Sequence, residues 1–165
     1  MNGATTVLLV AALGVAVTAC EPEPITLNFV FPAEISYLYS ETVQVSMVRA
    51  SAAQPLDCTQ LLRWATNNIG DFETEQEYRG VSVCELNDGG LTFNDIGEHE
   101  RAFVAVVRGR SNRLLLTGCA REETTLETKE IDLFLWTAPE YANHVEAIGE
   151  LTCVSVEEKC SRGCR

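Results

Sequence analysis

Two stretches near the beginning of the chain alternate between apolar and polar residues. In 25–31 isoleucine, leucine and phenylalanine occupy every second position, and in 42–48 valine and methionine do the same. A period of two residues is typical of a β-strand that buries one face. The pattern predicts strands at 25–31 and 42–48, and we expect them to be neighbours.

The period then changes from two residues to that of a helix. Between 58 and 66 apolar residues recur at i, i+3, i+4 and i+7, and Asp57, followed by a glutamine three residues later, has the pattern of an N-cap. These features predict a short helix. Because Cys58 lies on its apolar face, a disulfide from it would join the helix to the sheet, with Cys119 or Cys84 as the partner.

Strand patterns continue through the second half of the chain. Phe134 and Trp136 lie on the second face of the strand at 130–137, so we expect both of its faces to be covered. The range 140–147 is polar and fits either a loop or a helical turn. Strands are expected at 81–86, 91–93, 101–108, 114–120, 130–137 and 151–156, and the nearly continuous apolar runs 101–108 and 114–120 predict a central hairpin.

An uncharged apolar run of thirteen residues, 7–19, precedes all of these strands and ends at Cys20. At about 1.5 Å per residue it spans roughly 20 Å, which is short for a bilayer core of about 30 Å but suits a signal peptide. Val17-Thr18-Ala19-Cys20 resembles the lipobox of bacterial lipoproteins, although 1–6 lack the usual Lys or Arg. The resemblance implies that 1–19 are cleaved and that Cys20 carries acyl chains such as palmitate. The alternative is a buried hydrophobic helix.

The lipoprotein resemblance also implies where the protein lies. Two or three acyl chains contribute roughly 20 to 30 kcal/mol of membrane binding, enough for a stable anchor. The Pro-rich tether, residues 20–24, spans on the order of 12 Å. The remaining chain, 25–165, has the length of one domain with a Cys-containing C-terminal tail. We therefore expect a cell-envelope protein held close to the outer membrane or to a periplasmic membrane face.

Short strands, turns and one helix together predict a mostly β fold, an antiparallel β-sandwich braced by disulfides. A first strand, a cysteine-bearing helix and a leucine-rich hairpin ending in Gly118-Cys119 make this part of the chain similar to the immunoglobulin-like and transthyretin-like modules of bacterial surface lipoproteins. The similarity covers roughly 25–137 and rests on pattern rather than on a motif.

Charge and cysteine content narrow the classes of partner and site. The chain has 24 acidic and 12 basic residues, a net charge of −12, so it repels nucleic acid and attracts cationic partners, unless the charge serves only solubility. An even number of cysteines beyond Cys20 predicts up to three disulfides in an exported chain, with the pairing open. No Cys-x-x-Cys is present, which argues against a zinc site or a thioredoxin-like site. The disulfide candidates are Cys58, Cys84, Cys119, Cys153, Cys160 and Cys164.

Three local features are candidate sites. Arg108, Arg110 and Arg113 gather at the hairpin turn, where they would contact a carboxylate or phosphate, or simply make the turn polar. His99 stands between two glutamates and is a candidate pH-sensitive position, or a loop histidine without a role. The acidic range 71–77 lacks the ligand spacing of an EF-hand, so we expect a solvated loop rather than a calcium site.

No catalytic motif is present in the sequence. We find no nucleophile elbow, zinc-protease helix, phosphate loop or dinucleotide fingerprint. The sequence therefore predicts a non-enzymatic lipoprotein, without cofactor or metal, that binds or scaffolds a cationic protein or an envelope polymer. One alternative is an acidic inhibitor or decoy for a cationic protein such as a lysozyme. Small disulfide-bonded lipoproteins of that kind exist, but this sequence carries none of the residues that mark their family. The other is a hydrolase of envelope polymers that uses paired carboxylates.

Overall fold

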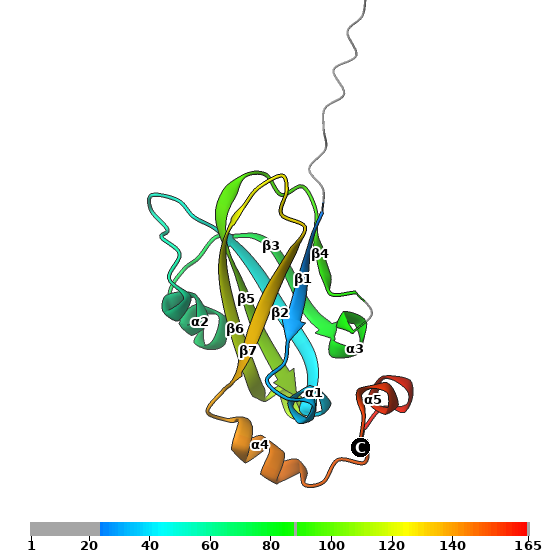
Figure 1. The fold of residues 1–165 in the computed structure, drawn as a ribbon. Coiled ribbons are helices and arrows are strands. Elements are labelled where there is room, and N and C mark those ends of the chain that lie inside the picture. The colour runs from blue at the N-terminus through cyan, green and yellow to red at the C-terminus, as the bar shows by residue number, and fades with distance from the viewer. Residues whose placement is uncertain (1–23, 88, 165) are drawn as a thin grey trace, which may run out of the picture.

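The computed structural model describes residues 24–87 and 89–164, and the lipobox lies outside them. Seven strands form a single sheet, and five α-helices and one 3₁₀-helix surround it (Figure 1). The strands are β1 Ile25–Val30, β2 Ser40–Arg49, β3 Thr74–Ser82, β4 Leu91–Phe93, β5 His99–Gly109, β6 Leu114–Thr124 and β7 Glu130–Thr137. The helices are α1 Glu34–Tyr39, α2 Cys58–Asn67, α3 Val83–Leu86, η1 Arg110–Asn112, α4 Tyr141–Ile148 and α5 Val156–Arg162.

The sheet is nearly closed into a barrel, so the predicted antiparallel sandwich is wrong although the mostly β class is confirmed. The strand order is β3-β2-β5-β6-β7-β1-β4. β1 runs parallel to β7, with Thr26 opposite Glu130 and Val30 opposite Phe134, and it is therefore not a neighbour of β2. Consecutive strands are neighbours in only roughly two-thirds of cases, and alternation alone does not show which strands pair with a distant segment instead.

Side chains rather than a strand ladder join the two edge strands. Tyr78 Oη on β3 donates to the carbonyl of Thr92 on β4 at 2.8 Å, and Gln76 Nε2 donates to the carbonyl of Asn94 at 2.8 Å. The ring of Tyr78 also meets Phe93 edge to face, with centroids 5.1 Å apart. These contacts hold the β3 and β4 edges together and close the barrel at its upper half.

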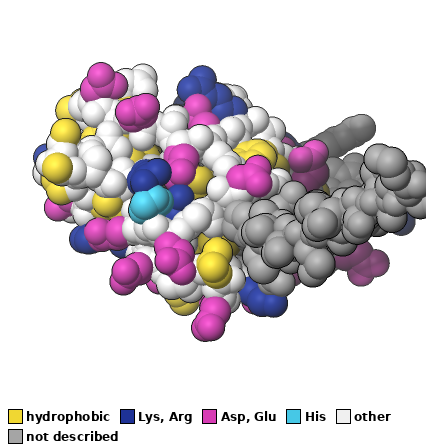
Figure 2. All heavy atoms as spheres, turned by 90° about the horizontal axis from the view of Figure 1, so that it is seen from above, with side chains coloured by type: hydrophobic (Ala, Val, Ile, Leu, Met, Phe, Trp, Pro, Cys, Tyr) yellow, Lys and Arg dark blue, Asp and Glu magenta, His cyan; other side chains and the backbone are white. Residues whose placement is uncertain are grey.

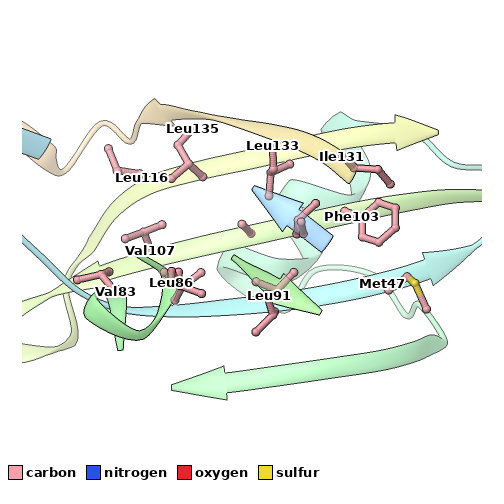
Figure 3. Close-up of a cluster of buried hydrophobic side chains, with 14 of the residues drawn as sticks. Met47, Val83, Leu86, Leu91, Phe103, Val107, Leu116, Ile131, Leu133 and Leu135 are labelled. Atoms are coloured by element: carbon pink, nitrogen blue, oxygen red, sulfur yellow. The ribbon is translucent and has the colours of Figure 1, made fainter. Parts of the chain in front are cut away.

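The barrel interior is filled by buried apolar side chains from β1, β2, β4, β5, β6 and β7 and from α3, and the partly buried Tyr78 and Val81 of β3 pack against them (Figure 3). The rings of Phe93 and Phe103 meet edge to face at 5.5 Å in its centre. At Gly118 the strands β6 and β7 approach so closely that a Cβ would lie 2.7 Å from the carbonyl oxygen of Phe134. The interior is thus a packed core.

A second apolar cluster lies outside the barrel, between α2 and the outer face of β5 and β6. Leu61 of α2 is fully buried there with Ala102 and Val104 of β5, and the disulfide from Cys58 to Cys119 joins the helix to β6. This arrangement confirms the predicted helix, the predicted hairpin and one of the two pairings proposed for Cys58. It also explains why β5 reads as a continuous apolar run, since it is buried on both faces.

Several segments differ from the expected pattern. The predicted strand at 81–86 is instead the end of β3 followed by α3, where the side chain of Ser82 accepts from the N–H of Cys84. The predicted acidic loop at 71–77 contains the first half of β3, where Gln44 and Arg101 bind its carboxylates. The predicted last strand at 151–156 is irregular and leads into α5, so the expected single helix is one of five.

The C-terminal tail is tied to the lower end of the barrel by one disulfide and a buried lysine, and a second disulfide lies within the tail. Cys160 of α5 pairs with Cys84 of α3, and Cys153 pairs with Cys164. Lys159 is only 6% exposed, and its Nζ donates to the carbonyl oxygens of Tyr37, Leu38 and Ser40 at the end of α1. All six cysteines expected in disulfides are therefore paired.

Within 24–87 and 89–164, no helix has both the length and the apolar character needed to cross a bilayer.

Candidate binding surface

The outer face of β7 carries two large aromatic side chains that no other element within the described residues covers. Along the strand the outward positions are acidic in its upper half and aromatic in its lower half. Phe134 is 55% exposed and Trp136 is 54% exposed, so the prediction that this face is covered is wrong. The reason is that α2 covers the outer face only over β5 and β6 and does not extend to β7.

The exposed apolar surface continues onto β1. The parallel register places Val30, which is 36% exposed, directly opposite Phe134. Above them the outward-facing residues of the two strands are polar. Asn28 of β1 donates to Asp132 of β7 at 3.3 Å and lies 3.5 Å from Glu130. We call the surface formed by Val30, Phe134, Trp136, Asp132 and Glu130 the β1–β7 face.

A shallow apolar groove borders this face on the other side of β1, below β4. Val30 belongs to both, so the groove and the β1–β7 face form one continuous surface. We call it the β1 groove. It is lined by Asn28, Phe29, Val30, Phe31, Ala33, Glu34, Tyr37, Leu86, Asn87, Gly89, Gly90 and Val156.

The arginine cluster at the β5–β6 turn is present, but two of its members make internal contacts. Arg108 donates to the carbonyl of Asn112 at 3.1 Å. Arg110 donates to the carbonyl of Cys164 and lies 3.7 Å from Glu41, which joins the turn to the C-terminal tail. These two guanidinium groups therefore have structural partners, and the contact of Arg108, Arg110 and Arg113 with an external anion stays a prediction.

His144 of α4 lies beneath this turn and was not singled out by the sequence. Its side chain is 2% exposed, and within the described residues Nε2 has no hydrogen-bond partner. A Cβ at Gly109 would lie only 2.6 Å from Nε2, so the turn packs directly on the ring. Burial, followed by the charges of Arg113 and Arg110, lowers the pKa of His144, which keeps the imidazole neutral at pH 7. Only the fold brings these groups together.

His99 lies at the opposite, upper end of the barrel, where Arg49 contacts its Nε2. Beside it Glu75 accepts two hydrogen bonds from the buried Arg101, at 2.7 and 3.1 Å, and these bonds lower the pKa of Glu75. Exposed carboxylates of β5, β6 and β7 surround this end, as Figure 2 shows. The arrangement holds Glu75 ionised, which suits a structural ion pair better than a general acid.

No three His, Cys, Asp or Glu side chains in 24–87 and 89–164 are grouped closely enough to hold a metal ion. Cys20, the predicted lipidation site, lies outside these ranges.

Comparisons with known proteins add no family to this picture. No protein-family model, no curated protein and no solved structure matches the chain.

Proposed function

We propose that the protein is an exported, lipid-anchored binding protein of the cell envelope, without catalytic activity. The lipobox resemblance at Val17-Thr18-Ala19-Cys20 supports the anchor. Three disulfides support an oxidising compartment outside the cytosol, because thiols are kept reduced inside. The packed barrel and the internal ion pair of Glu75 support a scaffold rather than an enzyme.

The observation that carries the binding role is the β1–β7 face. Two half-exposed aromatic side chains lie next to Val30, and the interior of the same barrel is filled. Contiguous apolar surface rimmed by polar groups marks interaction sites, and tryptophan is among the residues that contribute most to protein–protein binding. The face is therefore the surface on which we expect a partner to dock.

The chemistry of the face indicates a cationic protein as the partner. Glu130 and Asp132 flank the aromatic pair, and the whole chain carries a net charge of −12. A second copy of the chain would be repelled by the same charges. Phe134 lies level with Val30, six residues and roughly 20 Å along β1 from Pro24, so the aromatic pair lies toward the end of β1 that is farther from an anchor at Cys20. An acidic inhibitor of a cationic enzyme, such as a lysozyme, is a specific form of this proposal that the same charges favour.

Serine in place of Trp136 is expected to weaken binding of the partner by at least about tenfold while changing the free energy of unfolding by less than about 1 kcal/mol. The ring is half exposed, so little burial is lost on substitution. A photoreactive benzoylphenylalanine in place of Phe134, introduced in the native cell, identifies the partner by cross-linking. Titration of the purified protein with the purified partner then gives the affinity of each variant.

Leu126 supplies the matched control. It is 55% exposed, as Phe134 is, but it lies in the turn between β6 and β7 at the upper end. The photoreactive group in place of Leu126 should not capture the same protein, and Leu126→Ser should leave its affinity unchanged. The partner should be basic, and its affinity should fall with added salt. A captured protein that binds Trp136→Ser as tightly as wild type would refute the proposed face.

Mass spectrometry of the protein extracted from native membranes tests the anchor separately. We expect a mature chain that begins at an acylated Cys20, with the other six cysteines oxidised. An unmodified chain that begins at Met1 would remove the envelope location from the proposal.

A further inference from the structure

The edge of β1 that borders the β1 groove is open over its second half. β4 pairs with β1 only at Ile25, Thr26 and Leu27, and within the described residues no strand pairs with this edge beyond Leu27. Gly90, the residue before β4, is the last point at which this segment lies close against β1, since a Cβ there would be 2.7 Å from the carbonyl oxygen of Leu27. The barrel thus has a gap one short strand long below β4.

The backbone of Phe29 is directed into this gap. The N–H of Thr26 donates to Lys129, toward β7, and successive residues of a strand present their backbone groups to alternate sides. Asn28 and Val30 therefore bond to β7, whereas the N–H and C=O of Phe29 point to the open edge. An unpaired edge of this kind is a template for pairing with another strand.

The surroundings of the gap suit an extended chain with alternating side chains. Toward the barrel interior the groove is lined by Phe29, Tyr37, Leu86 and Val156, all buried or partly buried. Its outer rim carries the exposed carboxylate of Glu34. A strand added beside Phe29 would direct every second side chain onto the apolar wall and the others toward solvent and Glu34.

We propose that the β1 groove binds an extended basic and apolar segment of the cationic partner by strand addition, antiparallel to β1 in the line that β4 follows. This inference rests on the proposed function, and it adds the mode of recognition. Main-chain hydrogen bonds to Phe29 supply affinity, and the apolar wall selects alternate side chains. Charge favours a foreign basic segment over a second copy of this acidic chain.

The probe for this proposal is a blocked hexapeptide that alternates lysine and valine. In an antiparallel pair, residues directly opposite each other point to the same face, so the valines lie opposite Phe29 with their N–H groups toward β1. N-methylation of the valines should weaken binding to the folded, disulfide-bonded protein by at least about tenfold, because it removes these donors. N-methylation of the lysines, whose N–H groups point away from β1, should have little effect and is the matched control. Fluorescence anisotropy of a labelled peptide gives each affinity.

Two further measurements locate the bound peptide. Hydrogen exchange at the Phe29 amide should slow by at least about tenfold at saturation. The Glu34→Lys variant should bind the lysine–valine peptide at least about tenfold more weakly, and the wild-type protein should bind a peptide with glutamates in place of the lysines more weakly to the same degree. Trp136→Ser should bind the peptide normally, so a failure of the β1–β7 face and a failure of the groove give different results.

Three outcomes would overturn the strand-addition proposal. One is that the lysine–valine peptide shows no binding up to about 1 mM. Another is that the peptides methylated on valine and on lysine bind equally well, or that Phe29 gains no protection. The third is that the free protein sediments as a dimer in which the Phe29 amide is already protected, which would assign the open edge to a second copy.

Discussion

Glutamine in place of Glu75 is expected to lower the free energy of unfolding by about 3 kcal/mol, because it leaves the buried charge of Arg101 unpaired. Arg101 is 1% exposed at the upper end of the barrel, and both its Nε and its Nη2 donate to Glu75. A glutamine can accept through one oxygen only and carries no charge. Urea denaturation at pH 7 measures the loss.

An exposed ion pair in the same sheet provides the control. The side chains of Arg121 and Glu100 are 50% and 45% exposed, so Glu100→Gln should cost less than about 1 kcal/mol. Arg101→Met added to Glu75→Gln removes the unpaired charge. The double variant should therefore be more stable than Glu75→Gln alone. If the loss of stability in the double variant equals the sum of the losses in the two single variants, the unpaired charge of Arg101 is not the cause.

The same ion pair makes stability depend on pH. Hydrogen bonds from Arg101 hold the pKa of Glu75 below its ordinary value of 4.5. A carboxylate whose pKa is lower in the folded state stabilises the protein above 4.5, and this stabilisation is lost as the pH falls through the folded-state pKa. The stability difference between wild type and Glu75→Gln should therefore shrink as the pH falls below 4.5. A difference that does not change with pH would exclude Glu75 as the group responsible.

The elements that the sequence predicted correctly are those determined by local pattern. The side chain of Asp57 accepts from the N–H of Gln60 at 3.0 Å, as the N-cap pattern implies, and α2 follows. The nearly continuous apolar runs of β5 and β6 likewise predicted their hairpin, because a short turn joins them. In these cases, the information needed lies within one continuous segment of the chain.

The features that could not be predicted depend on contacts between distant segments. The parallel pairing of β1 with β7 joins residues more than 100 positions apart, and it turns a sandwich pattern into a barrel. β3 is rich in carboxylates because Arg101 and Gln44 pair with two of them, and these partners lie on other strands. The candidate site was missed for a related reason, since Phe134 and Trp136 have the pattern of a covered face and only the position of α2 leaves them exposed.

Removal of the disulfide between Cys84 and Cys160 by paired serine substitutions is expected to lower the free energy of unfolding by about 4 kcal/mol and to release α5 from the barrel. The bond joins residues 76 positions apart, so it restricts the unfolded chain more than a short loop would. It also holds a helix of seven residues, a length that is not stable alone in water. Lys159 remains as a second tie within the helix itself, but burial lowers its pKa and thus opposes docking of its charge. Urea denaturation and hydrogen exchange across 156–162 measure the two effects.

The disulfide between Cys153 and Cys164 is the matched comparison, because it closes a loop of only 11 positions within the same tail. Its removal by paired serines should cost about 3 kcal/mol, and the amides of α5 should stay protected by Cys160 and Lys159. Equal exchange across α5 in both paired variants would show that the other contacts of the tail, those of Lys159 and Arg110 among them, keep the helix docked without the disulfide. Because Val156 of α5 lines the β1 groove, release of the helix should also weaken binding of the lysine–valine peptide in the Cys84 and Cys160 variant alone.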